Sequence, residues 1–90
     1  MITKHADILR HMLGVKGYGP RSRQGTRNYF CAGIGTDDYD TLMEMWRLSL
    51  VRVGIKINDG TSQYFHATLE GCQAIELSKA ATNRALGKDK

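Results

Sequence analysis

The sequence predicts one α+β domain whose elements follow the order α-β-α-β-β-α. Residues 3–13 and 36–50 repeat apolar side chains at steps of three and four, which is the period of a helix. Residues 51–57, VRVGIKI, alternate apolar and polar side chains, which is the period of a half-buried strand. The turn-forming run Asn58-Asp59-Gly60 follows directly and predicts a hairpin. The 90 residues are enough for one domain over 1–90.

The first helix is predicted over residues 3–13. Thr3 is a suitable N-cap, Leu9 and Leu13 share one face, and Gly14 supplies the stop. A short strand is predicted at residues 28–32, NYFCA, because aromatic residues favour a strand packed against a core.

The segment between these elements is a predicted flexible basic loop, residues 14–27. Its first part, GVKGYGPRSRQG, contains four glycines and the single proline, which oppose regular structure. The loop carries four cations and no acid, so it accounts for the whole net charge of +4; these cations are Lys16, Arg21, Arg23 and Arg27. Such cations can bind phosphates, and Tyr18 can stack on a base. The alternative is a solvated loop that only aids solubility.

The second helix is predicted within residues 36–50, TDDYDTLMEMWRLSL. Thr36 or Asp37 can cap it, and its acidic first turn suits the positive end of the helix dipole. We expect Trp46 to anchor this helix in the core, because it falls on the three- and four-residue pattern with Leu42 and Leu50.

Two registers are possible for the hairpin. A two-residue turn would place Ile57 opposite Ser62, whereas a three-residue turn places Ile57 opposite Thr61 and Val53 opposite Phe65. The three-residue turn is preferred because it brings the apolar residues together. It predicts an outer face with basic and aromatic character, composed of Arg52, Lys56, Tyr64 and His66.

A third helix is predicted from the cap at Thr68 as far as Ala85, followed by a frayed tail at residues 86–90. The expected core combines apolar residues of every element: Leu9, Leu13, Phe30, Leu42, Met43, Trp46, Val53, Ile55, Phe65 and Ile75.

The run LMEMWRLSLVR, followed by DG and YFHATLEG, resembles winged-helix proteins. In that family a helix ends in a turn, a two-stranded wing hairpin follows, and a Thr-x-x-Gly step such as Thr68 to Gly71 opens the next helix. The resemblance implies a winged-helix-like fold that binds DNA. The segments ILRHMLGV, RNYF and YFHATLEG also resemble small uncharacterised proteins encoded in bacteriophages and prophages, a likeness that suggests a source and supplies no biochemical role.

The charge of the second helix bears on how nucleic acid would be bound. In the winged-helix family this helix would be the recognition helix, yet here it begins with Asp37, Asp38 and Asp40. A helix that enters a DNA groove normally presents basic and amide groups. We therefore expect the basic loop and the wing, instead of this helix, to make the contacts.

Two functional hypotheses follow. The first is a phage-type regulator that binds nucleic acid, with DNA favoured over RNA; its binding residues would be Lys16, Tyr18, Arg21, Arg23, Arg27, Arg52, Lys56, Tyr64 and His66. The second is a protein–protein interaction module or inhibitor that modulates a host or phage protein, because the acidic and basic segments together suit a protein surface. The oligomeric state is left open.

Enzymatic and metal chemistry are not predicted. The three histidines and two cysteines show no zinc-ligand spacing, and the sequence contains no Gly-x-Ser-x-Gly elbow, Walker motif or dinucleotide fingerprint. Cys31 and Cys72 are expected to be reduced and buried. No apolar run approaches the roughly 20 residues of a membrane-spanning helix, so a cytoplasmic protein is expected. No cofactor is expected, because the sequence contains none of the binding motifs named above.

Overall fold

The computed structural model describes residues 3–15 and 27–87. Its helices and strands, in chain order, are α1 (Thr3–Met12), β1 (Phe30–Gly33), α2 (Asp37–Arg47), β2 (Val51–Ile57), β3 (Ser62–Ala67), α3 (Leu69–Ala74) and α4 (Lys79–Ala85). The described strands form one antiparallel sheet in the order β1-β3-β2. The α+β class is therefore confirmed, but the predicted order lacked the last helix.

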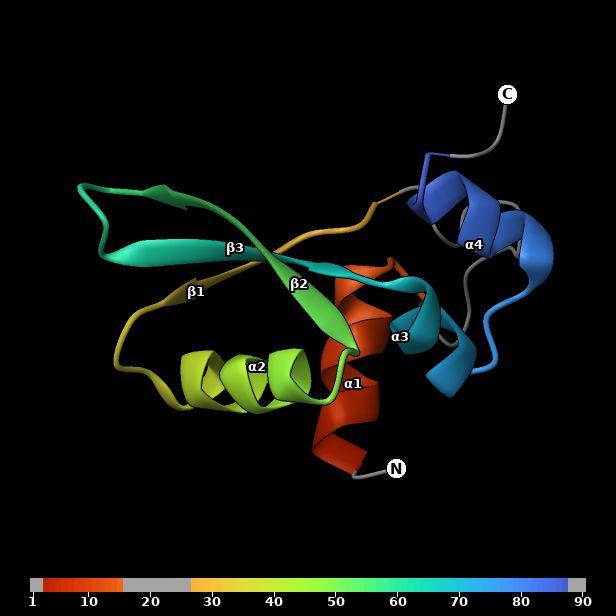
Figure 1. Cartoon of the computed structure of the whole chain (residues 1–90), viewed down its shortest axis with the longest axis horizontal. Helices are drawn as coiled ribbons and strands as arrows, with labels where there is room; N and C mark the ends of the chain where they lie inside the picture. The colour runs from red at the N-terminus through yellow and green to blue at the C-terminus, as the bar shows by residue number, and fades with distance from the viewer. Residues whose placement is uncertain (1–2, 16–26, 88–90) are drawn as a thin grey trace.

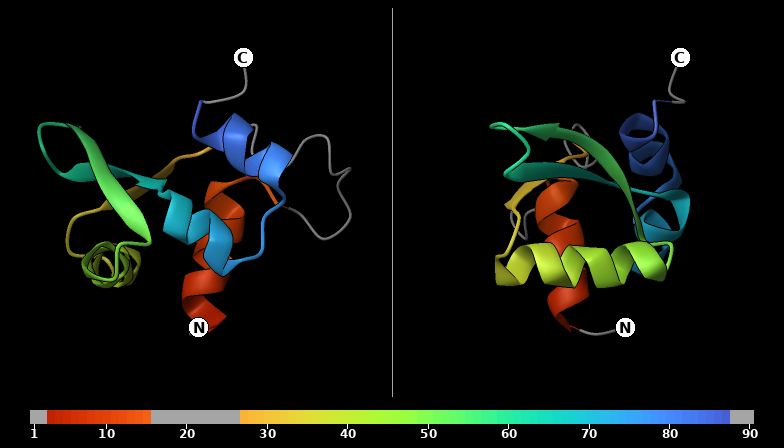
Figure 2. Two further views of the ribbon diagram at one scale, coloured as in Figure 1. Left: turned by 45° about the vertical axis from the view of Figure 1, so that its right-hand side comes forward. Right: turned by 60° about the vertical axis from the view of Figure 1, so that its left-hand side comes forward.

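The helices leave one face of the sheet largely open. Figures 1 and 2 show α1 and α2 beneath the sheet, whereas α3 and α4 stand at the end where β3 leaves it. Phe65 of the central strand β3 is fully buried in the core. Around it are further buried side chains of α1 and the residue after it, and of α2, β2 and α3: Leu9, Met12, Leu13, Leu42, Met45, Val51 and Cys72. No helix in the described part of the chain is long and apolar enough to cross a membrane.

Side-chain caps fix where three helices begin. Thr36 accepts a hydrogen bond from the N–H of Tyr39 and caps α2. Thr68 accepts from the N–H of Gly71 and caps α3, as the sequence predicts. Ser78 caps α4, which the sequence did not separate from α3. Thr3, the predicted cap of the first helix, lies within α1.

After two of the helices the chain adopts the left-handed backbone conformation at a residue that is not glycine. Beyond α2, Ser49 has φ 65°, and beyond α3, Glu76 has φ 56°. In both places the following N–H donates to the carbonyl five residues earlier, Leu50 to Met45 and Leu77 to Cys72. This is the Schellman pattern of a helix C-terminus, for which glycine is the usual residue. The predicted third helix is therefore wrong, because the chain forms two helices, α3 and α4, that are separated at Glu76. The sequence gives no glycine signal for this break.

The hairpin contains a β-bulge that combines both predicted registers. Near α2, Val53 pairs with Phe65, as the preferred register requires. Near the turn, Ile57 pairs with Ser62, so the predicted pairing with Thr61 is wrong. The ladder slips by one residue between Val53 and Lys56, and there the side-chain amide of Gln63 donates to the carbonyl of Gly54. The bulge turns the middle of β2 relative to its partner.

Three predicted core residues are exposed. Trp46 is 46% exposed and Ile55 is 70% exposed, while Val53 is also exposed. Met45 takes the expected place of Trp46, because α2 turns its Thr41, Leu42 and Met45 side inward. Val53 and Ile55 lie at the bulge of an edge strand, and no further strand of the described part of the chain covers them. The other predicted core residues are buried or pack against the core.

Candidate nucleic-acid interface

The open side of the sheet, here called the outer face, gathers residues of all three strands. Directly opposite residues of antiparallel strands point to the same side, and successive residues alternate. Phe30 and Phe65 form one pair on the inner side. The pairs Cys31 with Tyr64 and Arg52 with His66 therefore point outward.

The segment that leads into β1 joins this outer face to α1. The N–H of Tyr29 donates to the carbonyl of Met12 at 3.2 Å, which fixes the start of β1 against the end of α1. The Tyr29 ring lies 6.1 Å from the Tyr64 ring in an edge-to-face arrangement. The guanidinium carbon of Arg27 lies 4.5 Å from the centre of the Tyr29 ring. Arg27, Tyr29 and Tyr64 thus form a continuous cation and aromatic row, in which attraction between the cation and the ring face holds Arg27.

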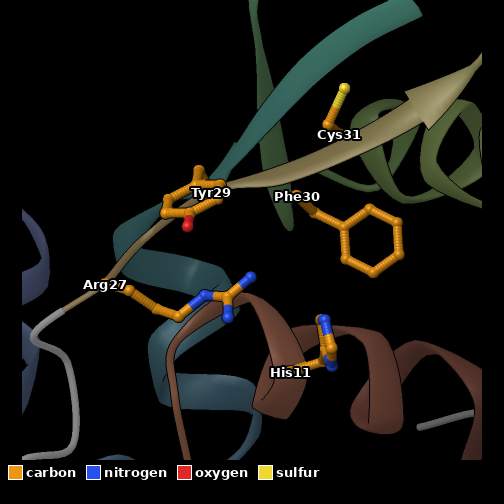
Figure 3. Close-up of a pocket in the computed structure, with 5 residues that line it drawn as sticks. All are labelled: His11, Arg27, Tyr29, Phe30 and Cys31. Carbon is orange, nitrogen blue, oxygen red and sulfur yellow. The ribbon is translucent and has the colours of Figure 1, made fainter.

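A shallow pocket lies beside this row, between α1 and the β1 edge. Its volume is about 220 Å³, and its lining includes His11, Arg27, Tyr29, Phe30 and Cys31. In Figure 3 the Arg27 guanidinium lies beneath the Tyr29 ring and points toward His11. The Nε of Arg27 is buried and has no hydrogen-bond partner among the described residues. The pocket therefore presents a cationic donor among aromatic rings.

His66 has a structural role on the outer face. Its Nδ1 lies 2.6 Å from the carbonyl oxygen of Asn28, and because a carbonyl only accepts, Nδ1 carries the proton. The ring covers Gly54 of β2: a Cβ added at Gly54 would lie 2.6 Å from Nε2 of His66. The ring therefore connects the segment before β1 to β2 across β3.

Asn28 joins three segments through its side chain. Its Nδ2 donates to the carbonyls of Ala67 and Ala85, at 3.2 Å each, and its Oδ1 accepts from the N–H of Ala67 at 2.7 Å. Together with the His66 bond to its carbonyl, these contacts hold the end of β3 and the end of α4 against the segment before β1. Asn28 thus fixes the position from which Arg27 and Tyr29 reach the outer face.

The structure brings some of the predicted binding residues together and separates others. Arg27, Arg52, Tyr64 and His66 are joined on or beside the outer face. Lys56 pairs with the buried Gln63, so the bulge places it on the opposite side, and its predicted place on the outer face is wrong. The remaining predicted residues lie outside the described part of the chain; they are Lys16, Tyr18, Arg21 and Arg23.

Sequence reasoning missed four lining residues of the pocket: His11, Tyr29, Phe30 and Cys31. The sequence signal for Tyr29 was its place in the run RNYF, where an aromatic residue stands two positions after the cation Arg27. Its contact with Tyr64 depends on the β1 and β3 register, which the sequence does not reveal. Cys31 is exposed, so its expected burial is wrong.

The acidic first turn of α2 lies far from Arg27. Asp37, Asp38 and Asp40 begin α2, which follows the opposite end of β1 from Arg27. Figure 1 shows the start of α2 at one end of the molecule and the segment entering β1 near α4 at the other. The acidic side chains therefore do not neutralise the cation and aromatic row.

The cysteines and acids of the described ranges suggest no second centre. Cys31 and Cys72 are both free, and burial raises the pKa of the Cys72 thiol while a hydrogen bond from Thr82 opposes this rise. Among the described residues, no three of the His, Cys, Asp or Glu side chains gather closely enough to hold a metal ion. The outer face and its pocket are therefore the site with the clearest chemistry.

Comparison of the chain with protein-family models, with curated proteins and with solved structures finds no match. The outer face and the pocket therefore carry the available indications of function.

Proposed function

We propose that this protein binds nucleic acid through the outer face of its sheet. The supporting observation is the row of Arg27, Tyr29 and Tyr64, with Arg52 on the same face. Guanidinium groups bind phosphate oxygens, and tyrosine rings stack on bases of any sequence. This combination is typical of surfaces that follow a nucleic-acid strand.

A winged-helix-like fold is part of the proposal. Helix α2 ends in a turn, the β2 and β3 hairpin follows, and Thr68 and Gly71 open α3. The hairpin would be the wing, and the outer face is the open surface beside it. The acidic start of α2 argues against insertion of that helix into a groove, so the contacts are assigned to the sheet.

Salt-dependent binding tests this function. Isotherms with duplex DNA, single-stranded DNA and RNA are measured at two salt concentrations, and affinity should fall as salt rises because phosphate contacts release counterions. Arg52→Ala should weaken binding and lower the salt slope by about one. Lys56→Ala is the matched control, because it is an exposed cation of the same strand on the opposite side of the sheet. Absence of binding to all three nucleic acids at low salt would end this proposal.

A second candidate function rests on a different surface. Large apolar side chains are exposed on and after α2 and on β2, which pack side by side: Trp46, Leu48, Val53 and Ile55. Exposed apolar clusters of this kind often mark contacts with another protein. Lys56 lies on this side of the sheet, so a partner with acidic groups around an apolar centre would complement it.

The two candidate functions are separable by variants. Trp46→Ser combined with Val53→Ser should abolish binding to an identified protein partner while leaving nucleic-acid affinity within about twofold, because Trp46 lies on α2 and Val53 pairs with Phe65 on the inner side of the sheet. Tyr64→Ala should have the reverse effect. Loss of nucleic-acid binding in the Trp46 and Val53 variant, with folding intact, would contradict the assignment of the nucleic-acid contacts to the outer face.

A further inference from the structure

The pocket beside β1 has an unused donor. Within residues 3–15 and 27–87, the buried Nε of Arg27 has no hydrogen-bond partner, although the guanidinium is held over the Tyr29 ring. A buried donor without an acceptor is costly, and native structures contain few of them. Arg27 also lines the pocket, so an acceptor on a bound ligand would lie beside its guanidinium.

The pocket is large enough for one chemical group of a larger ligand, and too small for a whole small molecule. Its volume of about 220 Å³ is below the roughly 300 to 1,000 Å³ of sites that enclose a whole small molecule. The pocket also adjoins the outer face, because Tyr29 lines it and contacts the Tyr64 ring. A ligand that inserts one group here has the rest of its length available for Tyr64 and Arg52 on the outer face.

The lining favours a planar aromatic group over a phosphate. Three of the lining residues, His11, Tyr29 and Phe30, present rings, and the rings of His11 and Phe30 contact each other edge-to-face with centroids 5.4 Å apart. A phosphate placed among them would lose hydration that the rings do not replace. A nucleobase has a face that stacks on rings and an edge with carbonyl or ring-nitrogen acceptors for the Arg27 donor.

We infer that the pocket receives one unpaired nucleobase, and that the outer face therefore prefers single-stranded nucleic acid to a duplex. This inference rests on the proposed nucleic-acid function and specifies its substrate. The base stacks against Tyr29, its acceptor edge faces Arg27, and the strand continues across Tyr64 toward Arg52.

A duplex fits these residues less well. Its bases are stacked and paired, so one enters a pocket only after it is flipped out of the helix, at an energetic cost. The described outer face and pocket rim offer two arginines, Arg27 and Arg52, whereas a duplex footprint commonly uses more phosphate contacts. The two tyrosines, Tyr29 and Tyr64, accompany these two arginines, and such a mixture of stacking rings and cations is typical of surfaces that bind single strands.

Fluorescence anisotropy with four labelled probes tests the inference: a twelve-nucleotide thymidine strand, an RNA strand of equal length, a duplex of equal length, and an abasic strand with the same number of phosphates. Both base-containing single strands should bind at least about tenfold more tightly than the duplex or the abasic strand. The abasic strand separates base contacts from phosphate contacts, because its charge is unchanged.

Two pairs of variants locate the base. Tyr29→Ala should weaken single-strand binding by roughly 5- to 150-fold, whereas Tyr29→Phe should restore most of it because the stacking ring remains. Arg27→Lys keeps the charge but lacks the planar guanidinium and its Nε, so it should lose affinity for the thymidine strand and leave the weak abasic binding unchanged. Melting temperatures of all variants show whether each one is folded.

The outcomes separate this inference from the function on which it rests. If none of the four probes binds, the nucleic-acid function itself fails. If the duplex or abasic strand binds as tightly as the thymidine strand, the function survives and the base pocket is rejected. Unchanged single-strand affinity in a folded Tyr29→Ala variant rejects the pocket as well.

Discussion

Asn28 contacts Ala67 as a neighbouring strand would, through both polar groups of the Ala67 backbone. The Nδ2 of Asn28 donates to the Ala67 carbonyl at 3.2 Å, and the Ala67 N–H donates to Oδ1 at 2.7 Å. The side-chain amide thus continues the β1 and β3 ladder beyond Phe30, where the backbone pairing starts. The same Nδ2 reaches Ala85 and adds α4 to the contact.

Replacement of Asn28 should therefore destabilise the whole domain. Asn28→Ala removes three side-chain hydrogen bonds, each with a net contribution of about 0.5 to 1.5 kcal/mol, and should lower the free energy of unfolding by about 2 to 4 kcal/mol. Urea unfolding measures the loss. Asn83→Ala is a suitable control, because Asn83 on α4 makes no side-chain hydrogen bond within the described ranges and its loss should cost less than about 0.5 kcal/mol. Equal stability of the two variants would contradict the role of Asn28.

Gly54 and His66 should be energetically coupled. Gly54→Ala places a Cβ 2.6 Å from Nε2 of a ring that Asn28 holds, so the variant should lose about 1 to 3 kcal/mol. His66→Ala removes the obstruction, and the double variant should be more stable than additivity predicts by at least about 0.5 kcal/mol. Gly33→Ala is the control, since its nearest contact is an ordinary 3.4 Å to Thr36. Additive losses in the thermodynamic cycle would refute the contact.

Adjacent residues of α2 should differ sharply in their effect on stability. Met45 is fully buried, so Met45→Ala should cost about 2 to 5 kcal/mol. Trp46 is 46% exposed, and Trp46→Ala should cost less than about 1.5 kcal/mol despite the larger side chain that it removes. Chemical denaturation of both variants checks the order. A greater loss at Trp46 than at Met45 would mean that α2 turns its other side to the core.

Glycine should stabilise two helix ends. Ser49 and Glu76 have φ values of 65° and 56°, where a side chain costs about 1 to 2 kcal/mol. Glycine removes this strain but adds freedom to the unfolded chain, so Ser49→Gly and Glu76→Gly should each raise stability by about 0.5 to 1 kcal/mol. Gln73→Gly, within the helical part of α3, should instead lower stability by about 1 kcal/mol. Thermal unfolding compares the three variants, and a loss at either helix end would contradict this account.

The buried Cys72 thiol should make stability fall at alkaline pH. Burial raises its pKa above the ordinary value of 9.0, so the unfolded chain ionises first. The contribution of this thiol is constant below about pH 9 and is lost as pH rises toward the raised pKa, by at most about 1.4 kcal/mol per pH unit. Unfolding free energies at pH 8 and 10 should therefore differ more in the natural protein than in Cys72→Ala. Equal differences would show that Cys72 ionises alike in both states.

Local signals predicted the elements that depend on neighbouring residues in the chain. The caps at Thr36 and Thr68 and the alternation in β2 act over a few residues, so the sequence alone indicated them. The break at Glu76 escaped prediction because its left-handed backbone occurs without glycine or proline. Trp46 and Met45 lie on overlapping helical stripes, and only the packing of α2 against α1 and the sheet selects between them.

The candidate site was predictable only in parts. Arg27, Arg52, Tyr64 and His66 stood out by residue type, but their arrangement depends on pairing between distant strands. The bulge that moves Lys56 to the other side follows from the fit between β2 and β3, which leaves no simple pattern in one strand.

The backbone bond between Tyr29 and Met12 holds together two described chain positions, at the base of the segment that joins α1 to β1. Gly14 and Arg27 meet at that base, where a Cβ on Gly14 would lie 3.3 Å from the Arg27 side chain. These contacts fix α1 and β1 relative to each other through described residues on both sides of the join. The core can therefore tolerate changes of sequence between them without a change in how α1 meets the sheet.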